Sequence, residues 1–255
     1  MLLLSTLLTA LIINFLLFLI AYRRQSDKLT DFAYALSFIV VVITAFTVSQ
    51  HRTAVSVAAS LAVLVWALRL GGFLVYRIRK TGKDKRFDDI RRDFTKFLKF
   101  WLGQGLVAWV LLLPLLFASS SPAGNISWLF WLGLIVWLAG WLTELVADAQ
   151  KFRFKQRADS QGKWIDEGLW HYSRHPNYFG EITIWIGIYL TVFVSLSPLE
   201  RLVGLISPLA IAISLLFISG IPPLEKYADA KWGKDKDYRA YKRRTSLLIP
   251  LWPRK

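Results

Sequence analysis

Two pairs of polar residues in otherwise apolar stretches have the spacing of neighbours on one helical face. Glu144 and Asp148 are four residues apart, and Lys155 continues the same face. Asn177 and Glu181 have the same separation. Carboxylate, amide and ammonium groups are costly beside hydrocarbon, so they commonly mark a ligand or cofactor site there. The two patterns therefore predict that two helix ends carry functional groups that face a bundle interior or a wet cavity.

Three ionisable residues fall within or at the margin of the apolar stretches, namely Arg69, Glu144 and Glu181. The alternative explanation for each is that its side chain reaches the membrane interface, where it forms a local ion pair. All three lie toward the same end of their stretches once these are read as membrane spans. We therefore expect them to border one site on that side.

A basic turn precedes the second pattern. Arg174 and His175 come directly before Pro176, which suits the first turn of a helix. The free N–H groups and dipole of such a helix start, with a cationic neighbour, form a reasonable phosphate site. The alternative is a juxtamembrane turn with only a capping role. The three histidines have no ligand spacing and the chain has no cysteine, so we predict no metal site.

The elements that position these residues are seven apolar blocks. They cover 2–22, 32–50, 53–76, 100–118, 127–143, 178–197 and 202–224. A helix needs ~20 apolar residues to cross a bilayer, and only helices and closed barrels satisfy their own backbone there. The first block lacks the basic start and cleavage site of a signal peptide, so it is read as an anchor. The sequence predicts an all-α, multi-pass bundle of about seven transmembrane helices.

Charge is distributed unequally between the segments that join these blocks. Segments 23–31, 77–99, 148–177 and 225–255 hold 3, 10, 6 and 10 of the 32 Lys and Arg residues, and the net charge is +15. Basic residues are enriched in cytoplasmic loops, which predicts an N-terminus outside and a cytoplasmic C-terminus. The excess of positive charge reflects topology and some attraction to anionic lipids, and we predict no nucleic-acid partner.

We find no internal repeat and no linker long enough to separate domains. The prediction is one membrane domain over 1–255, with spans of uncertain role in 1–65 and the chemistry-bearing region in 66–255. The composition, with 55% hydrophobic residues, also excludes an intrinsically disordered chain.

One stretch resembles a known family. GLWHYSRHPNYFGE at 168–181 resembles the signature of the steroid 5-alpha-reductase family, in particular its bacterial branch catalogued as a domain of unknown function. The same resemblance extends to 66–87, SGIPPLE at 219–225 and TSLLIPLWP at 245–253, and to Trp232, Gly233, Tyr238 and Tyr241. Sterol C14 and C7 reductases and isoprenylcysteine carboxyl methyltransferases carry related elements.

The resemblance implies a seven-span enzyme of the bacterial inner membrane with its cofactor side in the cytoplasm. Such an enzyme uses NADPH to reduce a carbon–carbon double bond in a hydrophobic, steroid- or terpenoid-like enone, as 3-oxo-5-alpha-steroid 4-dehydrogenases do. Its partners are that small molecule and membrane lipids. The cofactor-binding residues then expected are Asp148, Lys155, Lys163, Arg174, His175, Asn177 and Glu181. The basic members of this set would neutralise the phosphates.

Reduction of an enone also needs a donor aimed at the carbonyl oxygen, where negative charge develops. The catalytic candidates are Glu181, Tyr178, Tyr172, Tyr76 and Arg69. Glu181 would orient the nicotinamide, while a phenol polarises a carbonyl without a buried charge. Animal relatives use a Gln–Glu pair in the second span. Residues 32–50 contain no Glu, and Gln50 is their only amide.

Two other functions stay open. The shared RHP-x-Y-x-G pattern also suits an S-adenosylmethionine-dependent methyltransferase acting on a lipid or prenylated carboxylate. Glu181 directly after Gly180, and a single Glu225 where methyltransferases have paired acids, argue against it. The second alternative is a non-enzymatic membrane protein such as a transporter, but repeats and helices broken near the midplane are not evident.

Overall fold

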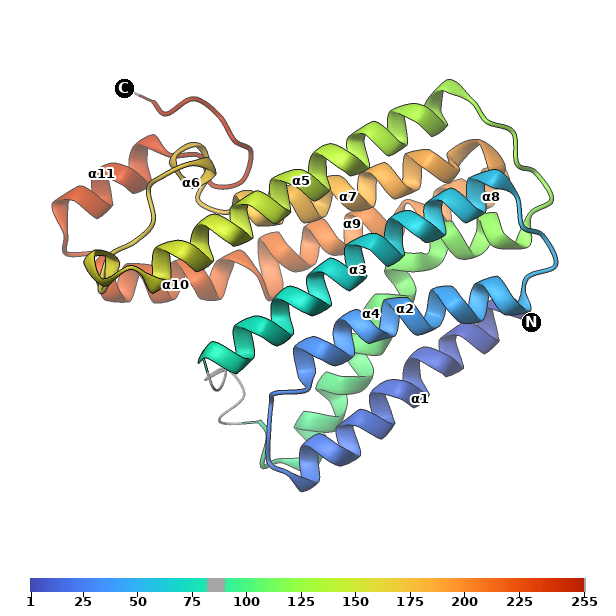
Figure 1. Ribbon diagram of the computed structural model, residues 1–255, viewed down its shortest axis with the longest axis horizontal. Helices are drawn as coiled ribbons and strands as arrows, with labels where there is room; N and C mark the ends of the chain where they lie inside the picture. Colours follow the sequence, from blue (N-terminus) through green and yellow to red (C-terminus); the bar gives the residue numbers. More distant parts are fainter. Residues whose placement is uncertain (82–89, 255) are drawn as a thin grey trace. The chain divides into compact units, whose positions relative to one another are not determined.

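The predicted spans are helices in the computed structural model, which describes residues 1–81 and 90–254 (Figure 1). The first five long helices are α1 (Leu2–Arg23), α2 (Thr30–Val48), α3 (Ala54–Thr81), α4 (Phe94–Ser120) and α5 (Trp128–Gln156). The chain continues through α6 (Leu169–Tyr172), α7 (Pro176–Val192), α8 (Pro198–Gly204), α9 (Ile206–Ile213), α10 (Ile221–Trp232) and α11 (Lys236–Arg244).

Seven helical segments in the described ranges are long and apolar enough to cross a membrane. They are Leu2–Arg23, Thr30–Val48, Ala54–Lys80, Phe94–Ser120, Trp128–Gln156, Pro176–Ser195 and Pro198–Trp232. These ranges contain no strand, and Ser173 and Ser246 form an isolated parallel bridge. The all-α, seven-span class is therefore confirmed. The direction of insertion stays a prediction, and the end of the 66–87 stretch lies outside the described residues.

The chain divides into two compact units. Unit 1 comprises Met1–Trp131 and Ile188–Ser207, and unit 2 comprises Leu132–Gly187 and Pro208–Lys255. The boundaries fall within α5, α7 and α9, so the membrane helices are shared between the units rather than separated by a linker.

Unit 1 is built on close packing of α1, α2 and α4. Phe18, Phe97 and Trp101 are fully buried at the centre of one apolar cluster. A Cβ at Gly105 of α4 would lie 2.8 Å from Nδ2 of Asn14, so α4 approaches α1 closely only because this residue is glycine. The Asn14 amide donates to the Ser37 hydroxyl at 2.7 Å, which links α1 to α2. Small and hydrogen-bonding residues are the usual means by which membrane helices associate.

Unit 2 contains a second close helix pair, α5 and α7, which run side by side in Figure 1. A Cβ at Gly180 would lie 2.7 Å from the backbone N of Glu144, and one at Gly187 would lie 2.4 Å from the backbone N of Trp137. Glycines on α7 thus bring its backbone against α5. This contact fixes where the polar ends of the two helices lie, and the site is built on those ends.

Helix α5 is longer than its predicted span of 127–143. Its 29 residues extend to Gln156, about 44 Å at 1.5 Å per residue, which exceeds a hydrocarbon core of ~30 Å. The additional turns carry Asp148 and Lys155. The helix is therefore longer than one crossing of the hydrocarbon core requires.

The last predicted span, 202–224, is interrupted. After α9 the residues Ser214–Ile218 form a π-helical turn, and Gly220 precedes α10. A Cβ at Gly220 would lie 2.5 Å from the carbonyl oxygen of Leu215, so the bend requires glycine. Because of this bend, α10 is a separate helix with its own N-terminal turn at Ile221–Pro223. Glu225 lies in the first turns of this helix.

Candidate functional site

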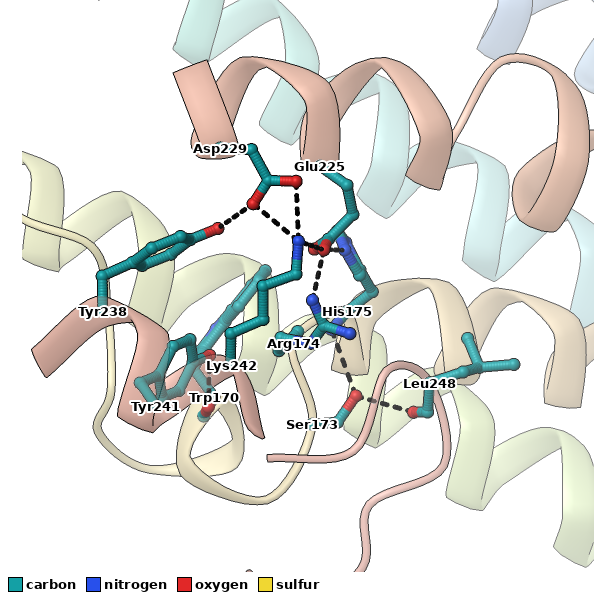
Figure 2. A network of polar contacts seen from close by, with 10 residues as sticks. All are labelled: Trp170, Ser173, Arg174, His175, Glu225, Asp229, Tyr238, Tyr241, Lys242 and Leu248. Atoms are coloured by element: carbon teal, nitrogen blue, oxygen red, sulfur yellow. Dashed lines mark hydrogen bonds and ion pairs between the residues drawn. The ribbon is translucent and has the colours of Figure 1, made fainter. Parts of the chain in front are cut away.

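The carboxylate of Glu225 is the centre of a polar cluster in unit 2 (Figure 2). Its Oε1 lies 3.0 Å from Nε2 of His175, and its Oε2 accepts hydrogen bonds from Arg174 and from Nζ of Lys242 at 3.0 Å. The side chains of Arg174 and Glu225 are mostly buried, 13% and 18% exposed. One acid on α10 therefore ties together the basic turn before α7 and a lysine on α11.

Asp229, one turn further along α10, extends the cluster. Its two oxygens accept from Nζ of Lys242 at 2.6 and 2.7 Å, and the Tyr238 hydroxyl donates to it at 3.4 Å. Burial opposes the charged form of Lys242, but its hydrogen bonds to Asp229 and Glu225 outweigh burial and raise its pKa. Lys242 is therefore a permanent cation between two acids.

His175 is buried, at 5% exposed. Burial lowers its pKa, an effect that the hydrogen bond to Glu225 opposes and the nearby cations Lys151 and Arg174 reinforce. The ring is then neutral at pH 7, and the hydrogen-bond pattern assigns the proton to Nε2, which donates to Glu225. Nδ1 is a buried acceptor with no hydrogen-bond partner among the described residues. A ligand that donates a hydrogen bond would satisfy it.

The basic turn is held by the C-terminal segment. The backbone N–H of Arg174 donates to the Ser246 carbonyl at 2.8 Å, and the Ser173 hydroxyl donates to the Leu248 carbonyl at 2.7 Å. The N–H of Leu251 donates to the Tyr172 carbonyl at 3.2 Å. Since these bonds fix the backbone of the turn, the direction of the Arg174 and His175 side chains is set before any ligand binds.

Aromatic side chains form a wall beside the polar cluster. Trp164 packs against Tyr238 with ring centroids 5.3 Å apart and against Trp232 at 6.2 Å. Trp170 is buried, accepts a hydrogen bond from the Tyr241 hydroxyl at its carbonyl (2.9 Å), and lies beneath Nζ of Lys151 at 4.4 Å. Burial raises the pKa of Tyr241, so its phenol stays protonated. The wall offers flat surfaces to a planar ligand.

The polar cluster and the aromatic wall border a cavity of about 350 Å³. Its basic lining residues are Lys151, Lys155, Lys163, Arg174 and Lys231, and its aromatic ones are Phe154, Trp164, Trp170, Tyr227, Trp232, Tyr238 and Tyr241. Among the described residues that line it, Glu225 is the one carboxylate, and it is already bound to three basic groups. Four lysines line the cavity in addition to the Arg174–Glu225 pair, so its lining favours an anion, and the rings favour a flat group beside it.

The structure brings four of the predicted cofactor-binding residues into this cavity: Lys155, Lys163, Arg174 and His175. Asp148, Asn177 and Glu181 lie on α5 and α7 in unit 2 but are not part of its lining. Oδ1 of Asn177 is buried and has no hydrogen-bond partner within 1–81 and 90–254.

The predicted catalytic residues are divided between the units. The ring of Tyr178 stacks on that of His175, with centroids 5.6 Å apart and planes 6° from parallel. Tyr172 contacts Trp252 of the C-terminal segment, at 5.4 Å between centroids. Arg69 and Tyr76 lie on α3 in unit 1, and the side chain of Tyr76 is half exposed. Glu181, Tyr178 and Tyr172 thus share a unit with the cavity.

Sequence reasoning did not place Glu225, Lys242 and Asp229 among the site residues, although they organise it. Glu225 is 50 residues from His175 along the chain. The signal that points to it is the SGIPPLE stretch, whose glycine and prolines start a new helix just before this acid. Two tryptophans of the segment 148–177, Trp164 and Trp170, also line the cavity.

In the part of the chain that the structure describes, no three His, Asp or Glu side chains gather as they would around a metal ion. A comparison with curated proteins finds no match, and a comparison with solved structures finds none either. A comparison with protein families matches residues 17–245 to "Protein of unknown function (DUF1295)". The match begins within α1, further toward the N-terminus than the 66–255 region that carried the resemblance. Since the match covers most of the sequence, this chain, with its seven helices able to cross a membrane, belongs to the DUF1295 family.

Proposed function

We propose that this protein is a membrane-embedded, NADPH-dependent reductase of a carbon–carbon double bond in a hydrophobic, steroid- or terpenoid-like enone. The observation that carries the proposal is the cavity of unit 2, in which five cationic side chains face a wall of aromatic rings. NADPH joins phosphates to flat ring systems, and both kinds of group have counterparts there. The 168–181 resemblance to steroid 5-alpha-reductases supports the same cofactor.

The size of the cavity suggests which part of the cofactor it holds. Pockets for small molecules span about 300–1,000 Å³, and this one is near the lower limit at about 350 Å³. It therefore suits one end of a dinucleotide. We assign it to the adenosine end, with Lys155, Lys163 and Lys231 around the phosphates and the Trp164 and Trp232 rings beside the adenine.

NADPH, when bound, would supply the hydride for the β-carbon of the double bond. The protein has to polarise the enone oxygen and to exclude water. Tyr178 is the phenol in ring contact with His175, and we propose that it donates to that oxygen. Glu181, one helical turn further along α7, would hold the carboxamide, and a proton from water would complete the α-carbon.

The methyltransferase alternative is less compatible with the charges of the cavity. S-adenosylmethionine carries a sulfonium and an ammonium group and no phosphate. A site with five cations and one carboxylate already bound to Arg174, His175 and Lys242 would repel it. Electrostatics alone therefore distinguishes the two cofactors at this site.

The test uses the full chain in lipid nanodiscs and calorimetry with NADPH, NADH and S-adenosylmethionine. We expect NADPH to bind most tightly and Lys163→Gln to weaken it about tenfold, the equivalent of ~1.4 kcal/mol. Lys96→Gln in unit 1, whose side chain is exposed, serves as the matched control and should bind NADPH like the wild type. Preferential binding of S-adenosylmethionine, or no binding of NADPH, would overturn the cofactor assignment.

Reductase chemistry needs a separate test. A steroid 4-en-3-one dissolved in the same nanodiscs should cause oxidation of NADPH, and Tyr178→Phe should slow it with little change in NADPH affinity. If NADPH binds and no enone probe is reduced, the cofactor assignment stands and the proposed substrate class fails.

A further inference from the structure

A second cavity, of about 280 Å³, lies between α11 and the C-terminal segment of unit 2. Its charged lining residues are Arg174, Lys242, Arg243, Arg244 and Arg254. Among the described residues that line it there is no carboxylate. Three of the five cations have acidic partners elsewhere: Arg174 and Lys242 on Glu225, and Arg244 on Asp166. Arg243 and Arg254 have none in the described chain, so the cavity keeps a net positive charge.

Two of the arginines that line this cavity each have a donor without a hydrogen-bond acceptor. Nε of Arg174 and Nε of Arg244 are both buried and have no partner within the described ranges. A buried, unpaired N–H of a charged group costs more than a neutral one. An anion with several oxygens, such as a phosphate group, would satisfy such donors and neutralise the excess charge.

The surroundings of the cavity are apolar and exposed. Its lining includes Leu247, Leu251 and Trp252, which are 39%, 53% and 82% exposed, and Ile249 between them is 53% exposed. Exposed aliphatic and Trp side chains beside cations are typical of a segment at the membrane interface. The charge and the apolar rim together specify a ligand that is both anionic and lipidic.

The position of the cavity agrees with an interfacial site. Arg174, which lines it, stands two residues before Pro176, where a membrane-spanning helix begins. The C-terminal segment is bonded to the same turn through Leu248, whose carbonyl accepts from Ser173 in Figure 2, and also through Ser246 and Leu251. The segment is therefore held at the level where lipid headgroups lie.

We infer that this second cavity binds the phosphate headgroup of an anionic phospholipid, with the exposed apolar side chains of 247–252 resting among the acyl chains. Arg243 and Arg254 supply the charge that selects anionic over zwitterionic lipid. Each such cation near the membrane surface adds electrostatic attraction to anionic lipid. The inference is independent of the proposed reductase activity.

The experiment is native mass spectrometry of the full chain, released from nanodiscs that contain equal amounts of phosphatidylglycerol and phosphatidylcholine. We expect the wild type to retain phosphatidylglycerol selectively and the double variant Arg243→Gln/Arg254→Gln to lose about tenfold of that selectivity. Arg23→Gln/Arg24→Gln, at the end of α1 in unit 1, is the matched control and should keep it. Equal retention of both lipids by the wild type, or an equal loss in both variants, would overturn the inference.

A second measurement uses the wild type alone and tests the inference even if the double variant fails to fold. The thermal unfolding of the wild type in neutral detergent should shift upward with added phosphatidylglycerol, less at high salt, and should not shift with inorganic phosphate at the same concentration. A shift with inorganic phosphate as large as that with the lipid would instead indicate a site for a free anion and would overturn the lipid assignment.

Discussion

Two polar networks, one in each unit, have different roles. In unit 1, Asn14 donates to the Ala10 carbonyl at 2.8 Å and to Ser37 at 2.7 Å, and Ser37 donates to the Ala33 carbonyl. In unit 2, charged side chains meet around Glu225 and border an open cavity. Polar residues that satisfy one another between helices hold a bundle together, whereas charged residues facing open volume can receive a ligand. Function is therefore expected in unit 2.

The strongest test of this difference between the units is to remove the charge of Glu225. Glu225→Gln leaves Arg174 and Lys242 mostly buried with less negative charge beside them, and losing one member of a buried ion cluster costs up to about 3–5 kcal/mol. We expect a large fall in the temperature at which the purified protein unfolds. The control Glu167→Gln removes an exposed partner of Arg157 and should cost at most ~1 kcal/mol. Equal effects of the two would contradict the central role of Glu225.

The next largest loss of stability is expected from a substitution at the contact between α5 and α7. Gly180→Ala places a Cβ 2.7 Å from backbone atoms of Glu144 and Gly140, which cannot yield without moving a helix. Overpacking of this kind costs about 1–3 kcal/mol and should shift the α7 end that carries Glu181. Gly72→Ala on α3 is the control, since a Cβ there meets nothing within 4 Å. The unfolding temperatures of both variants are measured in detergent. A Gly180→Ala protein as stable as the wild type would contradict the close contact between α5 and α7.

A smaller effect is expected from pH. Burial lowers the pKa of His175 below the ordinary value of 6.5. Below about pH 6.5 the imidazole therefore binds a proton in the unfolded chain more readily than in the folded protein. Stability is then lost as pH falls through this region and is fully present above it. We expect the unfolding temperature to fall between pH 6.5 and 5, and His175→Gln to remove part of that slope. Identical slopes for both proteins would contradict a buried neutral imidazole.

The smallest change concerns the hydrogen bonds of unit 1. Asn14→Ala removes the link between α1 and α2, and such bonds between membrane helices contribute ~0.6 kcal/mol on average. We expect a slight fall in unfolding temperature and an unchanged calorimetric affinity for NADPH. A loss of nucleotide binding in this variant would show that the polar network of unit 1 also serves the cofactor, and the division of roles drawn above would be lost.

The membrane helices could be predicted because their determinants are local. Seven runs of apolar residues gave seven spans, and Pro176 marked the start of α7. The polar ends of α5 and α7 followed from the i,i+4 spacing. The interruption at Ser214–Gly220 was not predicted, since the stretch is apolar throughout and only the close approach of Gly220 to Leu215 reveals the bend.

The site itself depends on contacts between distant parts of the chain. Arg174 and His175 were recognised as basic residues before a helix, but their common partner Glu225 is 51 and 50 residues away. Lys242 enters from a different helix again. Spacing within a helix carries no information about such pairs, because they depend on how α10 and α11 fold back onto the turn.

The hydrogen bond from Ser173 to Leu248 spans 75 residues, and this separation has a consequence for biosynthesis. Ribosomes add about 5–20 residues per second, so the turn at 172–174 waits on the order of 4–15 s for the C-terminal segment that completes it. During that interval α5 and α7 can already be inserted while Arg174 and His175 lack their fixed backbone. The nascent protein would thus acquire its membrane anchorage first and its ligand-binding competence last.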